Sequence, residues 1–345
     1  MGELSSLTPR RAQVLNSIVH NYIRTGRPVA SRSISRLRRH SLSAASIRNV
    51  MADLADDGYL SQPHTSAGRV PTEKAFRLFV QSLTAKRLLA AELERLRMQL
   101  GEMETVAGRV EKSSHLLMEM THGVGIAAAI PTDSQTLDQV ELLGLGDGRI
   151  LMIVVTRDKM VRNRVVMLNE YVSQGELHSI RNYINQNFSG CVLSEARARL
   201  RVRLEQASAV YDAILKKLIL LYEKGLLDIR VSPEVYMEGA SNLVGIDLRL
   251  TRERMRELLR VLEEKKRVLQ LLDQFLERPE GEVGVQVGLG DVHPSMRELS
   301  LIGVSVALPG GLGAKIAVLG PMRMDYGRVM SAVLHVGQAF QSVPV

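Results

Sequence analysis

The spacing of apolar residues changes three times along the chain, and these changes limit the folds that it can adopt. Up to about residue 121, apolar residues recur every three or four positions, as in amphipathic helices. From Gly123 they form short or alternating runs such as RILMIVVT, separated by DG or DK turns, which predicts an antiparallel sheet. A charged helical pattern occupies residues 195–280, and strand patterns resume at GVQVGLG, LSLIGVSVAL and LGAKIAVLG. We therefore expect an α+β protein in which a helical segment interrupts a sheet.

The first 80 residues predict three helices followed by a β-hairpin. Residues 8–24 carry apolar side chains on one helical face, after a capping threonine and a proline at the first helical position. A short helix over 31–38 and a third helix over 44–57, capped by Ser43, follow. Gly58 ends the third helix, and a loop rich in Pro, Ser and Gly separates two strand segments. This order of elements predicts a winged helix-turn-helix domain.

The positive charge of the chain is concentrated in its first quarter. Residues 1–80 contain twelve Lys and Arg against five Asp and Glu, whereas the rest of the chain contains 33 against 32. Lys and Arg side chains that contact phosphates release counterions, and this release supplies most nonspecific affinity for nucleic acids. The charge distribution therefore favours a polyanion as the partner of the N-terminal domain.

The third predicted helix has no acidic residue in its first turn, although the helix dipole favours Asp and Glu there. In a helix-turn-helix domain, this end of the recognition helix faces base edges in the major groove of DNA. Arg48 can bond to guanine in a bidentate manner, Asn49 can bond to adenine, and Ala45 can contact a thymine methyl group. Ser43 and Ser46 suit phosphate or mixed contacts. The helix therefore has the residues of a recognition helix.

Basic and polar residues around this helix complete the predicted contact surface. Side chains of the second helix, of the loop after it and of the hairpin loop are expected to contact the phosphate backbone or an adjacent groove. The predicted DNA-binding residues are Arg32, Arg36, Arg39, Ser43, Ala45, Ser46, Arg48, Asn49, His64, Ser66 and Arg69. Arg38 belongs to the same basic stretch. A helix-turn-helix that packs on other domains without binding DNA is the alternative.

Residues 72–121 predict helical structure, part of which has coiled-coil spacing. Apolar residues stand at positions 89, 93, 96, 100 and 103, and Val110 lies one heptad later. Two interpretations are open: a linker helix that packs on its own domain, and a helix that contacts a second copy of the chain. Gly101 and Gly108 argue against one long rigid rod.

Two further helices are expected in the second half of the chain. SQGELHSIRNYINQNF predicts a helix that crosses the first sheet segment. The last helix is expected over about 321–341, with Pro321 of GPMRMDY at its first position.

The sequence lacks the patterns of enzymes and metalloproteins. The glycine-rich stretch 143–149 precedes a strand and does not open a helix, so it predicts a hairpin turn, and LGLGDVHP at 288–295 predicts a loop. The eight histidines lack metal-ligand spacing, and neither a GxSxG motif nor a nucleophile–base pair occurs. Cys191 is expected to pack in the core. We expect no enzymatic activity, no cofactor and no bound metal.

The composition also predicts a cytoplasmic protein. No apolar run reaches the roughly 20 residues needed to cross a bilayer. MGELSSLTPRRAQ at the N-terminus lacks the hydrophobic segment of a signal peptide. A single cysteine excludes an intramolecular disulfide and fits a reducing compartment.

Several longer motifs resemble those of one known family. They are TGRPVASRSIS, LSAASIRNVMADLADDGYL and QPHTSAGRVPTEKAFRLFV in the first 80 residues, NRVV at 163–166, VYMEGASNL at 235–243 and GPMRMDYGRVM at 320–330. They span nearly the whole chain, and in this order they resemble the heat-inducible transcription repressor family, HrcA. The sequence departs from the family pattern at Ala44, where proline is usual, at Ser46, where threonine is usual, and at Met322 of the GPTRMDY motif. The loop LGDVHPS also lacks an expected acidic and asparagine pair.

The resemblance implies a division of the chain and a function. The implied domains are a winged helix-turn-helix over 1–82, a linker helix over 83–122, a GAF-like domain in two parts over 123–194 and 281–345, and an inserted dimerising domain over 195–280. Members of the family repress chaperone operons by binding an inverted repeat called CIRCE, and their activity depends on the GroEL chaperonin. An inverted repeat requires a two-fold homodimer whose recognition helices lie about 34 Å apart or at a multiple of that distance.

Two other classes of function are alternatives. The first is a small-ligand-sensing transcriptional regulator that uses the GAF-like pocket, although the sequence shows no converging polar set for a ligand. A ligand-dependent change in operator affinity would favour it. The second is an enzyme fused to a DNA-binding module, which would need a catalytic constellation that the sequence does not contain.

Overall fold

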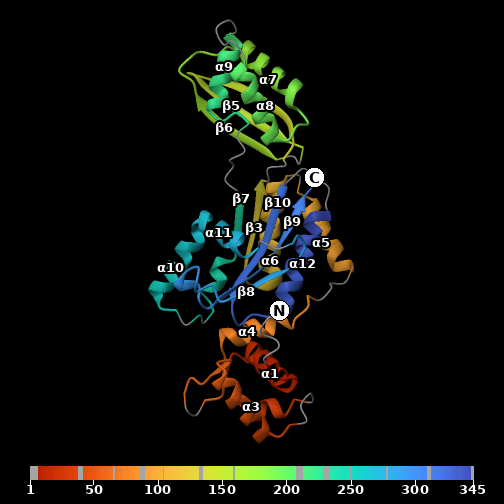
Figure 1. The fold of residues 1–345 in the computed structure, drawn as a ribbon, viewed down its shortest axis with the longest axis vertical. Helices are drawn as coiled ribbons and strands as arrows, with labels where there is room; N and C mark the ends of the chain where they lie inside the picture. Colours follow the sequence, from red (N-terminus) through yellow and green to blue (C-terminus); the bar gives the residue numbers. More distant parts are fainter. Residues whose placement is uncertain are drawn as a thin grey trace.

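The protein consists of three bodies that follow one another along its longest axis (Figure 1). The computed structural model describes residues 7–37, 42–64, 67–85, 90–103, 105–131, 135–157, 160–206, 213–227, 234–246, 248, 250–276, 279–308 and 312–342. The N-terminal body comprises α1 (Pro9–Thr25), α2 (Ser31–Ser35), α3 (Ala44–Asp56), β1 (Leu60–Ser61), β2 (Val70–Pro71) and α4 (Glu73–Gln81). Each body contains helices and strands, which confirms the α+β class.

Capping side chains explain where the helices of the N-terminal body begin and end. The Thr8 hydroxyl accepts a hydrogen bond from the backbone N–H three residues later, at 3.4 Å, and Gly26 ends α1 with a φ of 67°. The Ser43 hydroxyl accepts a hydrogen bond from the Ser46 N–H at 3.1 Å, so α3 begins where the sequence predicts. α2 ends at Ser35, before the predicted residue 38.

A five-stranded antiparallel sheet forms the centre of the middle body. Its strands, in spatial order, are β7 (Glu234–Glu238), β3 (Val124–Pro131), β10 (Leu312–Pro321), β9 (Leu299–Leu308) and β8 (Gly284–Val287). The helices around it are α5 (Ala90–Gly101), α6 (Val106–Thr121), α12 (Tyr326–Ser342), α10 (Arg252–Glu263), α11 (Lys265–Phe275), η2 (Ala240–Leu243) and η3 (Pro294–Met296). Successive strand residues serve opposite faces: Ile316 of β10 packs with α6 and α12, whereas Ala317 packs with α10 and α11.

The segment 72–121 is helical with two breaks, one after α4 and one after α5. Its apolar seam is buried within the chain, because Leu96, Leu100 and Val110 lie in the core that α12 completes. Packing on its own domain therefore accounts for the described part of the seam. Position 89 lies outside the described residues.

The third body has a separate core and a separate sheet. Its elements are β4 (Leu137–Gly146), β5 (Arg149–Thr156), β6 (Val161–Met167), α7 (Gln174–Phe188), α8 (Leu193–Gln206) and α9 (Ala213–Glu223). β4, β5 and β6 pair only with one another among the described strands. The chain leaves the five-stranded sheet after β3 and returns to it at β7.

The interruption of the sheet therefore differs from the expected range of 195–280. It begins before β4, so the strands over 137–167 belong to the interrupting body and do not extend the central sheet. It ends before β7, and α10 and α11, which were expected inside the insertion, pack on the central sheet. The reason is that strand pairing is long-range: β3 pairs with β10, which lies far away in the sequence.

The start of the last helix also differs from the prediction. Pro321 ends β10, and α12 starts at Tyr326. Asp325 caps this helix, because its Oδ1 accepts a hydrogen bond from the Arg328 N–H at 3.1 Å. The prediction fails because a proline without an N–H is tolerated both at a helix start and at the end of a strand.

The glycine-rich stretch 143–149 spans the end of β4 and the hairpin turn into β5, and the stretch 288–295 lies in a loop, so the predicted turn and loop are both present. Residues 146–149 connect β4 to β5, with Asp147 at a φ of 53° and Gly148 at 72°. Residues 288–295 lie between β8 and β9 and include part of η3. Cys191 is half-buried against the core of the third body.

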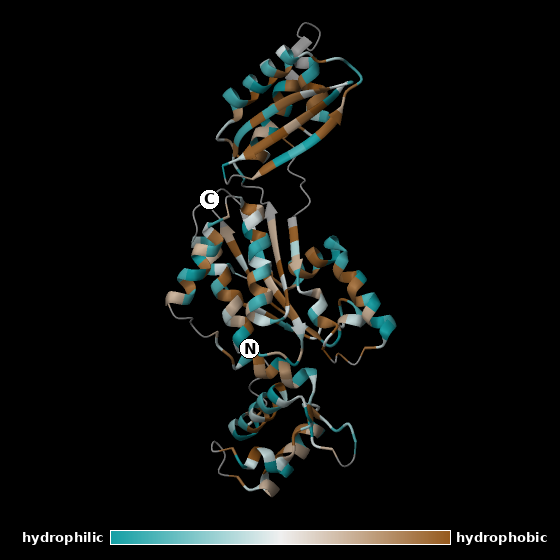
Figure 2. Cartoon of the chain, turned by 180° about the vertical axis from the view of Figure 1, so that it is seen from behind, coloured by the Kyte–Doolittle hydropathy of each residue, from teal (hydrophilic) through white to brown (hydrophobic). Residues whose placement is uncertain are grey.

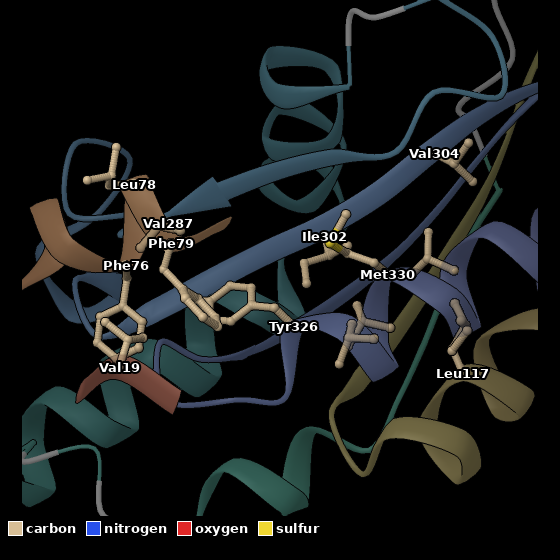
Figure 3. Packing of buried hydrophobic residues seen from close by; sticks show 14 of the residues in the cluster. Val19, Phe76, Leu78, Phe79, Leu117, Val287, Ile302, Val304, Tyr326 and Met330 are labelled. Atoms are coloured by element: carbon tan, nitrogen blue, oxygen red, sulfur yellow. The ribbon is translucent and has the colours of Figure 1, made fainter. Parts of the chain in front are cut away.

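The N-terminal and middle bodies share one hydrophobic core. Phe76 and Phe79 of α4 pack against Tyr326 of α12, with ring centroids 6.2 and 6.5 Å away (Figure 3). Tyr22 of α1 packs against Phe76 at 6.3 Å. We call these four residues the aromatic junction, because they join the two bodies.

Polar contacts reinforce the aromatic junction. Arg77 Nε donates to the carbonyl of Val287 at 3.3 Å, and Arg323 Nη1 donates to the carbonyl of Ile23 at 3.2 Å. Each bond joins a side chain of one body to the backbone of the other. The N-terminal body is therefore held in a fixed orientation on the central sheet.

Candidate nucleic-acid interface

The N-terminal half of α3 presents a polar surface to solvent. Ile47 and Val50 are buried in the core of the N-terminal body, which turns the opposite side of the helix outward. Ala45, Arg48 and Asn49 are exposed on that side. The three residues with predicted base contacts therefore share one accessible face.

Two serines define the beginning of α3. The Ser43 hydroxyl accepts from the Ser46 N–H, and the two hydroxyl oxygens lie 3.0 Å apart. Ser43 is exposed and Ser46 is half-buried. Because the two hydroxyls already interact, Ser46 is oriented toward the helix start.

The hairpin between β1 and β2 is fixed by a close backbone approach. Val29 and Arg69 exchange two backbone hydrogen bonds of 2.8 and 2.9 Å, which attach the hairpin to the segment before α2. A Cβ atom at Gly68 would lie 2.5 Å from the carbonyl oxygen of Val29, so only glycine allows this approach. His64 is exposed and Arg69 is half-buried, while Ser66 lies outside the described residues.

Several guanidinium groups of this body form no ion pair with the part of the chain that the structure describes. Arg32, Arg36 and Arg48 are exposed, and neither they nor Arg69 form an ion pair with any residue that the structure describes. Arg38 and Arg39 lie outside the described residues. Guanidinium groups without carboxylate partners are free to bind an external anion.

The C-terminal end of α3 has a different electrostatic environment. The Arg11 guanidinium lies 2.8 Å from Asp53 Oδ2 and 3.1 Å from Asp57 Oδ2. Lys74 Nζ donates to the Asp57 carbonyl at 3.0 Å and lies 4.3 Å from the centre of the Tyr59 ring. Sequence reasoning did not single out Arg11 and Lys74. The late acidic residues of α3 are the signal that could have indicated a need for cationic partners.

The described part of the chain was also compared with the requirements of a metal site, a membrane-spanning helix and a ligand cavity. It contains no group of three or more His, Cys, Asp or Glu side chains that could hold a metal ion. A search of its helices finds none with the length and apolarity required to cross a membrane. A cavity of about 500 Å³ lies between α10, α11 and the loop before η3, lined by both apolar and polar side chains.

These features define an α+β protein in which a small basic body with an exposed helix end is joined firmly to a larger sheet body. A family model described as the HrcA protein C terminal domain matches residues 108–330. The heat-inducible transcription repressor HrcA of Geobacter sulfurreducens is 36% identical over 335 residues, which covers 96% of each chain. That of Sorangium cellulosum is 35% identical over 338 residues, with the same coverage. The chain therefore belongs to the HrcA family of heat-inducible transcription repressors.

A solved structure supports the fold assignment. The crystal structure of a hypothetical protein at 2.2 Å resolution has a TM-score of 0.56 to this chain and covers 99% of both chains at 21% sequence identity. At this identity the similarity concerns the fold only. It extends over all three bodies.

Proposed function

We propose that this chain is a cytoplasmic, DNA-binding transcription repressor of heat-shock genes, and that its N-terminal body is a winged helix-turn-helix. The observation that carries the proposal is the exposed face of α3 with Arg48 and Asn49, in a body that also contains a hairpin after α3 and exposed arginines that form no ion pair with the described residues. Membership of the repressor family supports the same function. We propose no catalytic activity.

The predicted contact residues divide into two groups by their chemistry. Arg48, Asn49 and Ala45 contact base edges in the major groove. The remaining residues hold the phosphate backbone or an adjacent groove; they are Arg32, Arg36, Arg39, Ser43, Ser46, His64, Ser66 and Arg69. This division separates sequence discrimination from general affinity.

We propose that the middle body is GAF-like and that the third body forms a homodimer. The support for the dimer is an apolar sheet face. α7, α8 and α9 cover one side of the three-stranded sheet, and on β4 and β6 Leu143, Val161, Val165 and Met167 are 46–60% exposed. In the register of the strands, Leu143 lies opposite Leu151, which lies opposite Val165.

In Figure 2, hydrophobic colour covers much of this sheet; β5, RILMIVVT, is apolar over most of its length, whereas β6, VRNRVVM, also has a hydrophilic part. A contiguous exposed apolar patch on a soluble protein marks an interaction surface. A second copy of the chain is its proposed partner, because an inverted-repeat operator requires a two-fold dimer.

The proposed dimer surface can be tested by introducing a charged residue at the centre of the apolar sheet face. Val165→Lys should convert the dimer to a monomer, because a desolvated ammonium is costly in an apolar interface. The measurement is molar mass by light scattering during gel filtration. Val202→Lys is the matched control, since Val202 is 43% exposed on α8 and away from the sheet face. A Val165→Lys protein that remains dimeric would show that another surface forms the dimer.

The proposed operator is an inverted repeat of the CIRCE type, and the proposed activator is a GroEL-type chaperonin. The test is a gel shift with an inverted-repeat duplex and a scrambled duplex, with and without chaperonin, across a temperature series. We expect selective binding that chaperonin sustains to higher temperature. A folded sample that stays monomeric and binds both duplexes equally would disprove the proposal.

A small-ligand-sensing regulator is the second candidate, and the cavity between α10, α11 and the loop before η3 favours it. Val268, Leu271 and Met296 line its apolar part, and His293 lies at its polar edge. His293 Nδ1 lies 2.7 Å from the Ser295 hydroxyl oxygen and 3.3 Å from the Ser295 backbone nitrogen, which fixes the position of the ring. A small molecule that changes operator affinity would support this candidate.

A further inference from the structure

The acidic end of α3 creates a problem for a helix that approaches DNA. Asp53 lies four positions after Asn49, and residues with this spacing share one helical face. Four residues correspond to about 6 Å along the helix axis. This distance is shorter than the Debye length of about 10 Å at 0.1 M salt, so phosphates near Asn49 would sense an uncompensated Asp53.

Asp57 lies one helical turn after Asp53 and adds a second negative charge at this end of α3. Asp53 and Asp57 have 51% and 44% of their side-chain area exposed, so neither charge is hidden by burial. Both carboxylates also lie at the C-terminal end of a helix, where the dipole disfavours negative charge. Neutralising them requires a cation from another element.

Arg11 supplies this cation from the first turn of α1. One guanidinium nitrogen contacts Asp53 at 2.8 Å and another contacts Asp57 at 3.1 Å, so a single side chain spans both carboxylates. The hydrogen bond to Asp53 and the two carboxylate charges raise the pKa of Arg11, against a smaller opposing effect of desolvation. The Arg11 side chain is 29% exposed, and two of its guanidinium nitrogens are engaged by the carboxylates of α3.

We infer that Arg11 is a positioning residue that masks the negative charges of Asp53 and Asp57 and holds α3 against α1, so that the exposed face of α3 can approach a polyanion. Arg11 itself does not contact phosphate. The inference rests on the proposed function and adds a residue that acts through α3 on operator affinity.

The first variant removes the charge of Arg11. Arg11→Gln should weaken binding of an inverted-repeat duplex about fivefold at low salt, as expected for two carboxylates repelling nearby phosphates in water. The deficit should shrink as salt screens the repulsion. Arg10→Gln is the matched control, because Arg10 lies in the same helical turn, is exposed and forms no ion pair among the described residues. It should change affinity less than twofold.

The decisive variant also removes the two acids. Arg11→Gln combined with Asp53→Asn and Asp57→Asn should bind within twofold of the wild type, because no charge remains to be masked. If Arg11 contacts phosphate, this triple variant stays weak, and the slope of log affinity against log salt falls by about 0.9. That result would overturn the inference. An equal loss for Arg10→Gln would overturn it as well, because it would indicate a general charge effect.

Thermal melting by circular dichroism shows which variants are folded at the assay temperature. Even if Arg11→Gln alone is too unstable to measure, the triple variant distinguishes masking of the two acids from a direct contact between Arg11 and phosphate. A folded wild type that does not bind the duplex contradicts the proposed function itself, and this outcome is recognised before any variant is compared.

Discussion

At the scale of single residues, α3 places its proposed contact residues on one side and the residues that anchor it in the core on the other. Arg48 and Asn49 are exposed and, in the described part of the chain, Arg48 forms no ion pair, whereas the buried neighbours Ile47 and Val50 hold the helix in the core. The sequence predicts this arrangement well, because apolar residues at helical spacing define the buried side and leave the polar side by elimination.

Arg48 provides a test of sequence discrimination. In a bidentate contact with guanine, its removal costs about 1 to 3 kcal/mol at that operator position. We expect Arg48→Ala to relax the preference for one base pair in each half-site. The measurement is fluorescence anisotropy with a series of operators that carry single base-pair changes. Equal weakening for every operator would identify Arg48 as a phosphate contact. Arg36→Ala is the control, and it should weaken all operators uniformly.

Inference from the local sequence fails where a side chain contacts a partner on another helix or strand. Arg11 lies in α1, and its partners Asp53 and Asp57 lie in α3, so no local sequence pattern links them. Gly68 is a similar case. Its need for glycine comes from the carbonyl of Val29, which is brought near only by the folded hairpin.

At the scale of elements, the sequence predicts helices with strong caps and fails where one residue suits two structures. α1 and α3 begin at their predicted positions because Thr8 and Ser43 cap them. Pro321 suits both a strand end and a helix start, and the structure uses the strand end. The caps are local and chemically specific, while the choice at Pro321 depends on pairing with β9.

The contact between α6 and β7 predicts a pH-dependent stability. His115 Nδ1 lies 2.9 Å from Glu238 Oε2, and its Nε2 lies 3.1 Å from Glu119 Oε1. The hydrogen bond to Glu238 and the two carboxylates raise the pKa of His115, against the effects of desolvation and of Lys112. A raised pKa in the folded state means that the stabilisation is complete below the unfolded pKa of about 6.5 and is lost as pH rises through the folded value.

We therefore expect the Tm of the wild type to decline as pH rises through this range, and the decline to be smaller in His115→Gln. The effect is modest because these side chains are 36–55% exposed and partly screened by solvent. The measurement is a series of thermal melts at constant ionic strength. His20→Gln on α1 is the control, because His20 is exposed and forms no ion pair among the described residues. Parallel profiles for wild type and His115→Gln would contradict the prediction.

At the scale of the whole molecule, the arrangement of the three bodies is the part that sequence reasoning predicts least. The sequence shows strand segments and an interruption, but it does not show that β3 pairs with β10 while β4, β5 and β6 pair with one another. Strand partners far apart in the chain have no local signature, because alternation predicts a strand and leaves its neighbours undefined. The position of the third body between β3 and β7 follows only from these pairings.

The shared core between the N-terminal and middle bodies links the geometry of the whole molecule to the proposed DNA binding. Two recognition helices on a dimer gain from simultaneous binding only if their separation matches the two half-sites. The aromatic junction packs the N-terminal body against the middle body, and the Tyr326 hydroxyl orients its ring by donating to the Met322 carbonyl at 2.9 Å within the middle body. A looser junction should therefore weaken binding to a duplex with both half-sites (full-site affinity) more than binding to a duplex with one half-site (half-site affinity).

Phe79→Leu tests this coupling, since it keeps an apolar side chain but removes a ring interaction with Tyr326 worth about 0.5 to 1.5 kcal/mol. For the proposed dimer, we expect the ratio of full-site to half-site affinity to fall several-fold without a change in molar mass. The measurement is anisotropy with duplexes that contain one or two half-sites. Phe188→Leu is the matched control, because Phe188 packs against Tyr183 within the third body, 6.3 Å between ring centroids, and far from the junction. If both variants keep the wild-type ratio, the junction does not set the spacing of the recognition helices, and the dimer surface alone must do so.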